Sequence, residues 1–252
     1  MGTRRLAVVV LLALVASLLA PVLALHVDVA EAAPSTRSRL VKPGKRLPTG
    51  AACAEAVKSK PEIRPDNAEE NAFVPVDGVD YSLIPWTLDS FGMADEADTL
   101  RLRIDGNFTG TTNEIIQWGA CKWGFKHNII RAMAVAESAW RMSKVGDLDK
   151  GTPSYGILQV KAVHHPTTYP ASATSTAFNI DYALGYIRAC YEGHIDWLGQ
   201  SFEAYGAGDF WGCLGHWFSG GWQDEGALNY VSDVKAAKKQ RIWLSSVFDN
   251  WT

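Results

Sequence analysis

The sequence IIRAMAVAESAW, residues 129–140, decides the fold because it describes a helix that is apolar nearly all round. Such a helix must be buried in the protein. Glu137, near its end, would then face a low-dielectric wall. Because burial disfavours the charged form of a carboxylate, this glutamic acid can keep its proton near neutral pH and act as a general acid. The apolar or small positions are Ile129, Ile130, Ala132, Met133, Ala134, Ala136 and Ser138.

A simpler interpretation is that Glu137 closes the helix and meets water or a lysine, since most glutamates near a helix C-terminus are solvated. The sequence that follows favours chemistry instead. A loop with Asp147 and Asp149 leads into SYGILQV, residues 154–160, which we predict as a loop and a strand. Protonation of a leaving oxygen by a carboxylic acid is what cleavage of a glycosidic bond requires.

These blocks resemble the active-site core of Slt-type lytic transglycosylases and goose-type lysozymes, whose motifs read Glu-Ser and Gly-Leu-Met-Gln. Glu-Ser-x-Trp begins at Glu137, and Gly-Ile-Leu-Gln-Val ends at Val160. Further blocks follow in the family's order: NIDYALGYI at 179–187, with Ala183 where glycine is usual, WFSG at 217–220 in place of Tyr-Asn-Ala-Gly, and YVSDV at 230–234. The resemblance covers about residues 110–245, with a longer loop between Glu137 and Gln159.

The resemblance implies a mainly α, lysozyme-like α+β fold with a small β-hairpin at the active-site cleft. It also implies a peptidoglycan lytic transglycosylase that cuts the MurNAc-GlcNAc β-1,4 bond. Glu137 would protonate the leaving oxygen and then accept the proton of the sugar's own C6 hydroxyl, which closes a 1,6-anhydro ring. We expect no cofactor. The substrate-binding candidates are Ser154, Tyr155, Gln159, Trp217 and Tyr230.

Two alternatives stay open. An inverting muramidase or chitinase-like hydrolase needs a second carboxylate about 6.5 to 9.5 Å from the first to activate water. Asp147 and Asp149 are the nearby candidates, although both also suit a turn beside glycines. An inactive cell-wall-binding protein on a lysozyme-like fold is the other alternative, favoured by the altered block at 217–220.

The N-terminus is typical of an exported protein. Arg4 and Arg5 precede an apolar run over residues 6–25, and Ala30-Glu31-Ala32 offers a cleavage site, so residues 1–32 are predicted to be a signal peptide. The run is long enough to span a bilayer, which leaves a membrane signal anchor as an alternative. We therefore expect a secreted or cell-wall-associated protein.

Four cysteines in an exported chain are expected to form two disulfides. Three pairings are possible, and we predict Cys190 with Cys213 and Cys53 with Cys121. No Cys-x-x-Cys or His-x-x-x-His spacing occurs, so we expect no metal site. Four of the ten tryptophans are further candidates for stacking on sugars: Trp140, Trp211, Trp217 and Trp222.

Composition divides the rest of the chain. Residues 33–65 read as a basic, disordered linker that could contact anionic wall polymers, and 66–110 as an N-terminal extension with a strand at 99–104. The catalytic domain would span 111–252. The whole chain has a net charge of -3, which does not suggest binding to nucleic acid. We expect a monomer that binds peptidoglycan strands. The predicted helices are 111–123, from His127, 176–191, 195–204, 209–218 and 227–248.

Overall fold

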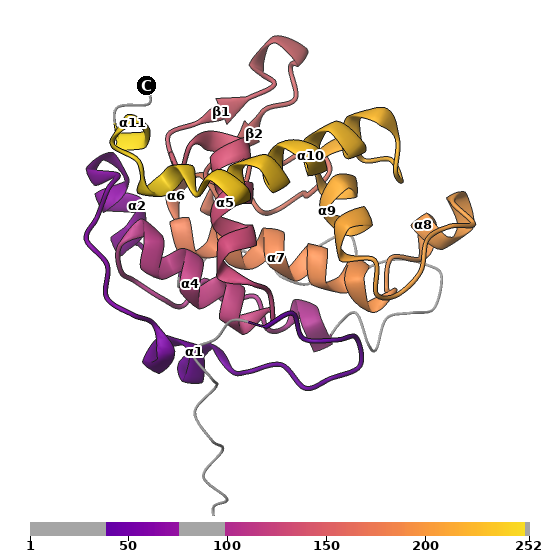
Figure 1. Ribbon diagram of the computed structural model, residues 1–252, viewed down its shortest axis with the longest axis horizontal. Helices are drawn as coiled ribbons and strands as arrows, with labels where there is room; N and C mark the ends of the chain where they lie inside the picture. Colours follow the sequence, from indigo (N-terminus) through magenta and orange to yellow (C-terminus); the bar gives the residue numbers. More distant parts are fainter. Residues whose placement is uncertain (1–38, 76–98, 250–252) are drawn as a thin grey trace, which may run out of the picture. The chain divides into compact units, whose positions relative to one another are not determined.

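The computed structural model describes residues 39–75 and 99–249. This part of the chain is mainly helical, with a small antiparallel sheet beside the helices (Figure 1). The predicted signal peptide or anchor lies outside the described residues. None of the helices that the structure describes is both long and apolar enough to span a bilayer.

Helices form most of the described residues. The α-helices are α1 (Gly50–Ala56), α2 (Ala68–Ala72), α4 (Thr112–Lys122), α5 (His127–Ser138), α6 (Ala171–Thr174), α7 (Thr176–Glu192), α8 (Asp196–Ser201), α9 (Phe210–Ser219), α10 (Glu225–Gln240) and α11 (Ser246–Asp249). Of these, α4, α5, α7, α8 and α9 lie close to the predicted ranges. Short 3-10 turns are η1 (Pro65–Asn67), η4 (Leu148–Lys150) and η5 (Ile242–Leu244). The strands are β1 (Val145–Gly146), β2 (Ser154–Tyr155) and β3 (Val160–Lys161).

The mainly α prediction is confirmed, and the small β element is larger than expected. It is a three-stranded antiparallel sheet in the order β1-β2-β3 rather than a two-stranded hairpin. Val145 pairs with Tyr155, and Tyr155 pairs with Val160. Each strand has only two residues, so the sheet serves to shape a loop region and contributes little to the core.

The core is built around α7, which is buried along nearly its whole length. It packs against α4 and α9, while α5 packs against α4 and α10 (Figure 1). The approach of α4 to α7 requires glycine at position 119, because a Cβ there would lie 2.4 Å from the Ile180 side chain. A capping box starts α4: the Thr111 side chain accepts from the Glu114 N–H, and the Glu114 side chain accepts from the Thr111 N–H.

The end of α5 fixes where Glu137 lies. Ala139 and Trp140 both adopt positive φ angles, 52° and 65°, and their N–H groups return to the carbonyls of Val135 and Ala134. The Trp140 ring is fully buried, and its indole N–H donates to the Arg131 carbonyl at 2.9 Å. The chain therefore turns sharply after Ser138 and leaves Glu137 on the last turn of the helix.

The predicted disorder of the basic linker is wrong for residues 39–65. Arg188 donates to the carbonyls of Val41 and Lys42 at 2.7 and 3.1 Å. Arg64 is 1% exposed and donates to the Ala139 and Phe248 carbonyls at 2.9 and 2.5 Å. Charge and proline content suggested a solvated tether, but the side chains of Arg64 and Glu62 are hydrogen-bonded to the helical domain instead. Residues 33–38 lie outside the described part.

Two predicted elements need correction. Residues 99–101 are helical and lead into a turn, where we predicted a strand. Leu100 and Ile104 are buried and Leu102 is 70% exposed, so the three alternating apolar residues do not share one face as they would in a strand. The predicted helix 227–248 is also divided, because Arg241 adopts a φ of 49° and separates α10 from η5 and α11.

Both predicted disulfide pairs are present. Cys53 and Cys121 are joined at 2.06 Å, and Cys190 and Cys213 at 2.04 Å. The first pair joins α1 to α4, and the second joins the end of α7 to α9. Two disulfides indicate that the chain folds in an oxidising compartment.

Candidate active site

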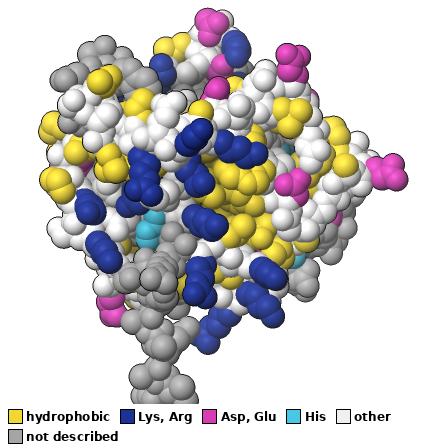
Figure 2. Space-filling model, viewed as in Figure 1, with side chains coloured by type: hydrophobic (Ala, Val, Ile, Leu, Met, Phe, Trp, Pro, Cys, Tyr) yellow, Lys and Arg dark blue, Asp and Glu magenta, His cyan; other side chains and the backbone are white. Residues whose placement is uncertain are grey.

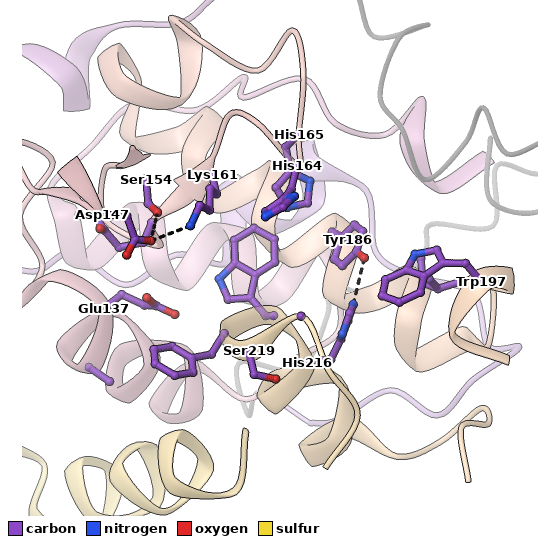
Figure 3. A pocket seen from close by; sticks show the side chains of 17 residues that line it. Glu137, Asp147, Ser154, Lys161, His164, His165, Tyr186, Trp197, His216 and Ser219 are labelled. Atoms are coloured by element: carbon purple, nitrogen blue, oxygen red, sulfur yellow. Dashed lines mark hydrogen bonds and ion pairs between the residues drawn. The ribbon is translucent and has the colours of Figure 1, made fainter. Parts of the chain in front are cut away.

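A cleft of about 620 Å³ opens beside the C-terminal end of α5 (Figure 3). Its volume falls within the range usual for ligand sites, roughly 300 to 1,000 Å³. The described lining residues come from α5, the sheet, the loop after β3, and helices α7, α8 and α9. They are Ala136, Glu137, Gly146, Asp147, Ser154, Gln159, Lys161, His164, His165, Tyr186, Ile195, Trp197, His216, Trp217, Phe218, Ser219 and Gly220.

Glu137 lies in this cleft, half-buried, with Tyr230 as its hydrogen-bond partner. The Tyr230 hydroxyl donates to Glu137 Oε1 at 2.5 Å. Burial raises the pKa of Glu137 to about 8, and the hydrogen bond from Tyr230 offsets part of this rise. Burial and the neighbouring carboxylate raise the pKa of Tyr230 well above its usual range. At neutral pH, Glu137 is therefore mostly protonated and Tyr230 remains a donor.

Phe218 covers the Tyr230 ring. The two rings are nearly parallel, 4° apart, with centroids 4.6 Å from each other, and Phe218 is 56% exposed at the cleft. Tyr230 itself is only 5% exposed. The sequence reasoning selected Trp217 from this block and missed Phe218, whose contact with Tyr230 depends on how α9 packs against α10.

Asp147, the first candidate second carboxylate, also lines the cleft. Its oxygens accept hydrogen bonds from Lys150 at 2.6 Å, Lys161 at 3.0 Å and Ser154 at 3.1 Å. Hydrogen bonds from Lys150 and Lys161 hold the pKa of Asp147 well below its usual range, burial opposes this shift in part, and Ser154 adds a smaller lowering effect. Asp147 is therefore an ionised carboxylate whose charge is balanced by two neighbouring cations. Asp149 is exposed and does not line the cleft.

Gln159 holds the sheet together at the cleft. Its amide N–H₂ donates to the carbonyls of Lys144 at 3.1 Å and Gly156 at 2.7 Å. Its side-chain oxygen lies so near Gly146 that a Cβ at that position would approach it to 2.4 Å. The amide N–H groups are therefore already used inside the protein, and the amide oxygen is the group left to meet a ligand.

Of three further predicted residues, two line the cleft and one lies outside it. Trp217 lines the cleft, donates to the Leu158 carbonyl at 3.1 Å and stacks on His165 with ring centroids 5.2 Å apart. Ser154 lines the cleft too, although it bonds Asp147 rather than Glu137. Tyr155 does not line the cleft and packs instead against Tyr169, at 4.9 Å between ring centroids.

The other candidate tryptophans do not line the cleft. Trp140 and Trp222 are buried, and Trp211 lies partly buried beneath the Lys235 ammonium, 4.7 Å from its ring centroid. Sequence reasoning missed other cleft residues as well, among them Lys161, Trp197 and His216, which belong to no quoted motif. It also missed Tyr186, which lies in the block at 179–187 but was not selected. Among the described residues, no group of three or more His, Cys, Asp or Glu side chains is arranged to hold a metal ion.

Compared with protein-family models, with curated proteins and with solved structures, the chain gives no match. The case for a function therefore depends on the geometry of the cleft and on the motifs that form it.

Proposed function

We propose that this chain is an exported peptidoglycan lytic transglycosylase that uses Glu137 as its single acid and base. The observation that carries the proposal is a protonated carboxyl group in a cleft of ligand size, with a tyrosine hydroxyl bonded to it. A general acid works best when its pKa lies near the working pH. The pKa of about 8 for Glu137 meets that condition.

In the first step, the Glu137 carboxyl donates its proton to the bridging oxygen as the bond between that oxygen and C1 of the MurNAc ring breaks. The GlcNAc portion leaves with a free 4-hydroxyl. In the second step, the Glu137 carboxylate accepts the proton of the C6 hydroxyl as that oxygen bonds to C1. Because the nucleophile belongs to the same sugar, no water has to be positioned.

Tyr230 assists between the two steps. Its hydroxyl donates to Glu137 Oε1, so it stabilises the carboxylate that exists after the first proton transfer. Phe218 stacks on the Tyr230 ring, which is only 5% exposed, and so holds that ring beside Glu137. A binding protein that only held the wall would gain nothing from a carboxyl group kept protonated at a cost in stability.

One observation favours a second candidate, an inverting hydrolase. Asp147 faces the same cleft and remains ionised, as the base of a hydrolase must. Against this role, the hydrogen bonds from Lys150, Lys161 and Ser154 hold its pKa well below the usual range, which makes Asp147 a weak base toward water. We therefore place the transglycosylase first.

The products of purified peptidoglycan decide between the two reactions. A transglycosylase releases 1,6-anhydro muropeptides, and a hydrolase releases reducing muropeptides that are heavier by one water. Mass spectrometry of a wild-type digest should find the anhydro forms predominantly, and Asp147→Asn should give the same products. Mainly hydrated products would show that the hydrolase is correct.

The expected contact with anionic wall polymers changes in character. Because the basic residues from 39 to 65 belong to an ordered segment, any such contact would use a fixed surface and not a flexible tether. Figure 2 shows Lys and Arg side chains gathered around an apolar area on the face in view, with Asp and Glu side chains mostly toward its rim. We propose a secreted or wall-associated location, in keeping with the two disulfides.

A further inference from the structure

The cleft has a second, aromatic end. Glu137 and Asp147 lie at one end, and Tyr186, Trp197 and His216 lie at the other (Figure 3). Tyr186 comes from α7, Trp197 from α8 and His216 from α9. Tyr186 belongs to the block at 179–187 quoted above, whereas Trp197 and His216 lie in none of the quoted family motifs.

The polar atoms at this end bond to one another. His216 Nδ1 lies 3.1 Å from the Gly221 carbonyl, which can only accept, so this nitrogen carries the proton. His216 Nε2 then accepts from the Tyr186 hydroxyl at 3.1 Å. Burial raises the pKa of Tyr186, while a hydrogen bond from Trp197 opposes the rise. The hydrogen-bonding groups of these three side chains are therefore already bonded within the protein.

Charge is also absent from these three side chains. His216 is 3% exposed, and its burial lowers its pKa, against the opposing effect of its backbone contacts. It is therefore neutral at neutral pH, as are tyrosine and tryptophan. The surface that remains for a ligand consists of aromatic rings, with Ile195 beside them.

Trp197 is the ring most open to a ligand. Trp197 is 40% exposed, while Tyr186 is 8% exposed. The Trp197 and His216 rings pack edge to face, with centroids 5.3 Å apart and 61° between their planes. The segment that carries it is closed by the Cys190–Cys213 disulfide. Within that segment, the Tyr205 hydroxyl donates to the Cys190 carbonyl at 3.0 Å and accepts from the Ile195 N–H at 3.1 Å. The tryptophan is thus held in place before any ligand binds.

We propose that Trp197, with Tyr186 and His216, forms a remote subsite that binds the apolar face of an N-acetylhexosamine ring of the strand cleaved at Glu137. This inference rests on the proposed function. A β-linked hexosamine has ring faces made of C–H groups, which pack on aromatic rings without needing a hydrogen bond from them. The uncharged, internally bonded wall matches such a face and gives no partner to the carboxylates of a stem peptide. Binding here holds long strands in register while Glu137 reacts.

The test uses chitohexaose, a β-1,4-linked GlcNAc hexamer, with the Glu137→Gln protein so that binding is measured without turnover. In that background, calorimetry should show that Trp197→Ala weakens hexamer binding about five- to tenfold, and that Trp197→Phe recovers most of the loss. Trp211→Ala is the matched control, because Trp211 is a partly buried tryptophan outside the cleft, and it should change binding less than twofold. Unchanged hexamer binding in Trp197→Ala, or no hexamer binding by the parent, overturns the subsite.

A second measurement does not depend on the folding of Trp197→Ala. The indole N–H signal of Trp197, assigned with Trp197→Phe, should shift when the hexamer is added to the Glu137→Gln protein, and an unmoved signal overturns the proposal. A stem peptide that shifts this signal while the hexamer does not would assign the site to peptide.

Wild-type protein that leaves peptidoglycan uncut while binding the hexamer through Trp197 would contradict the proposed function alone. Cleavage without any dependence on Trp197 would defeat the subsite alone.

Discussion

Glu137 and Asp147 are two carboxyl groups in one cleft, and their surroundings keep Glu137 mostly protonated and Asp147 ionised at neutral pH. Glu137 lies at the end of a buried apolar helix with one tyrosine hydroxyl beside it. Asp147 lies in the turn after β1 with two lysines and a serine around it. Burial raises one pKa to about 8, and the two cations depress the other. Environments that separate two pKa values in this way are how a protein divides acid from base roles.

The comparison also separates reactive from structural groups. Glu137 has a removable proton and one hydrogen-bond partner, so it can exchange that proton with a substrate. Asp147 has three partners and joins the turn to Lys161 on β3. A carboxylate with both oxygens already bonded is better suited to holding the turn than to proton transfer.

The largest effect should follow from removing the proton that Glu137 donates. Glu137→Gln keeps the shape of the side chain, and we expect wall-clearing activity to fall by at least about 10²-fold, the scale of general acid catalysis. Turbidity loss of peptidoglycan suspensions measures this rate. Glu203→Gln is the control, because Glu203 is exposed outside the cleft and should change the rate little. Near wild-type digestion by Glu137→Gln would end the assignment of Glu137.

Tyr230→Phe tests the partner of the acid and should lower activity about tenfold. Since protonated Glu137 is required to start the reaction, wild-type kcat/KM should fall above pH of about 8, the pKa of Glu137. The hydrogen bond from Tyr230 lowers that pKa, so its loss should move the alkaline limb to higher pH. A pH profile of kcat/KM checks this, and a limb that stays in place would mean that Tyr230 does not act through Glu137.

Much of the helical framework can be predicted from this sequence because its signals are local. The capping residues at Thr111 and Glu114 and the apolar positions of α5 and α7 lie within one or two helical turns of each other. Leu100 and Ile104 show the limit, since three alternating apolar residues fit a strand until packing decides that Leu102 faces outward. Arg64 shows it too, because its buried partners are 75 and 184 residues away.

The candidate site could be predicted only in part, for the same reason. The apolar residues of α5 itself indicate that Glu137 lies in low-dielectric surroundings, so the sequence alone indicates a raised pKa. Asp147 gave no such signal, because one of its two lysines, Lys161, reaches it from a different strand. The aromatic end depends on three separate helices, α7, α8 and α9, which only the folded chain brings together.

Asp147→Asn should have a smaller effect than the changes at Glu137 and Tyr230. The substitution removes the charge that pairs with Lys150 and Lys161 but keeps a side chain that can still accept hydrogen bonds. Such exposed ion pairs stabilise a protein by less than about 1 kcal/mol. We expect peptidoglycan turnover within about threefold of wild type, measured by the same turbidity assay. Abolished turnover in a folded Asp147→Asn protein would make Asp147 the base and reverse the comparison.

The smallest effect we expect is a gain in stability, and it tests the environment of Glu137 without any substrate. The folded state raises the pKa of this group from about 4.5 to about 8, so between those pH values the folded protein binds more protons than the unfolded chain. Stability therefore falls as pH rises through this window. Glu137→Gln cannot ionise and escapes that loss, and because Glu137 is half-buried we expect it to be more stable than wild type by about 1 to 2 kcal/mol at pH 8. Below pH of about 4.5 the side chain at position 137 is uncharged in both wild type and Glu137→Gln, and the difference in stability should disappear.

Urea unfolding of the two proteins at pH 4 and pH 8 measures this difference. Asp147→Asn is the control and should show no such gain at pH 8. Equal stability of wild type and Glu137→Gln at both pH values would mean that Glu137 ionises as readily in the fold as in water, and the contrast between the two carboxylates would then be lost.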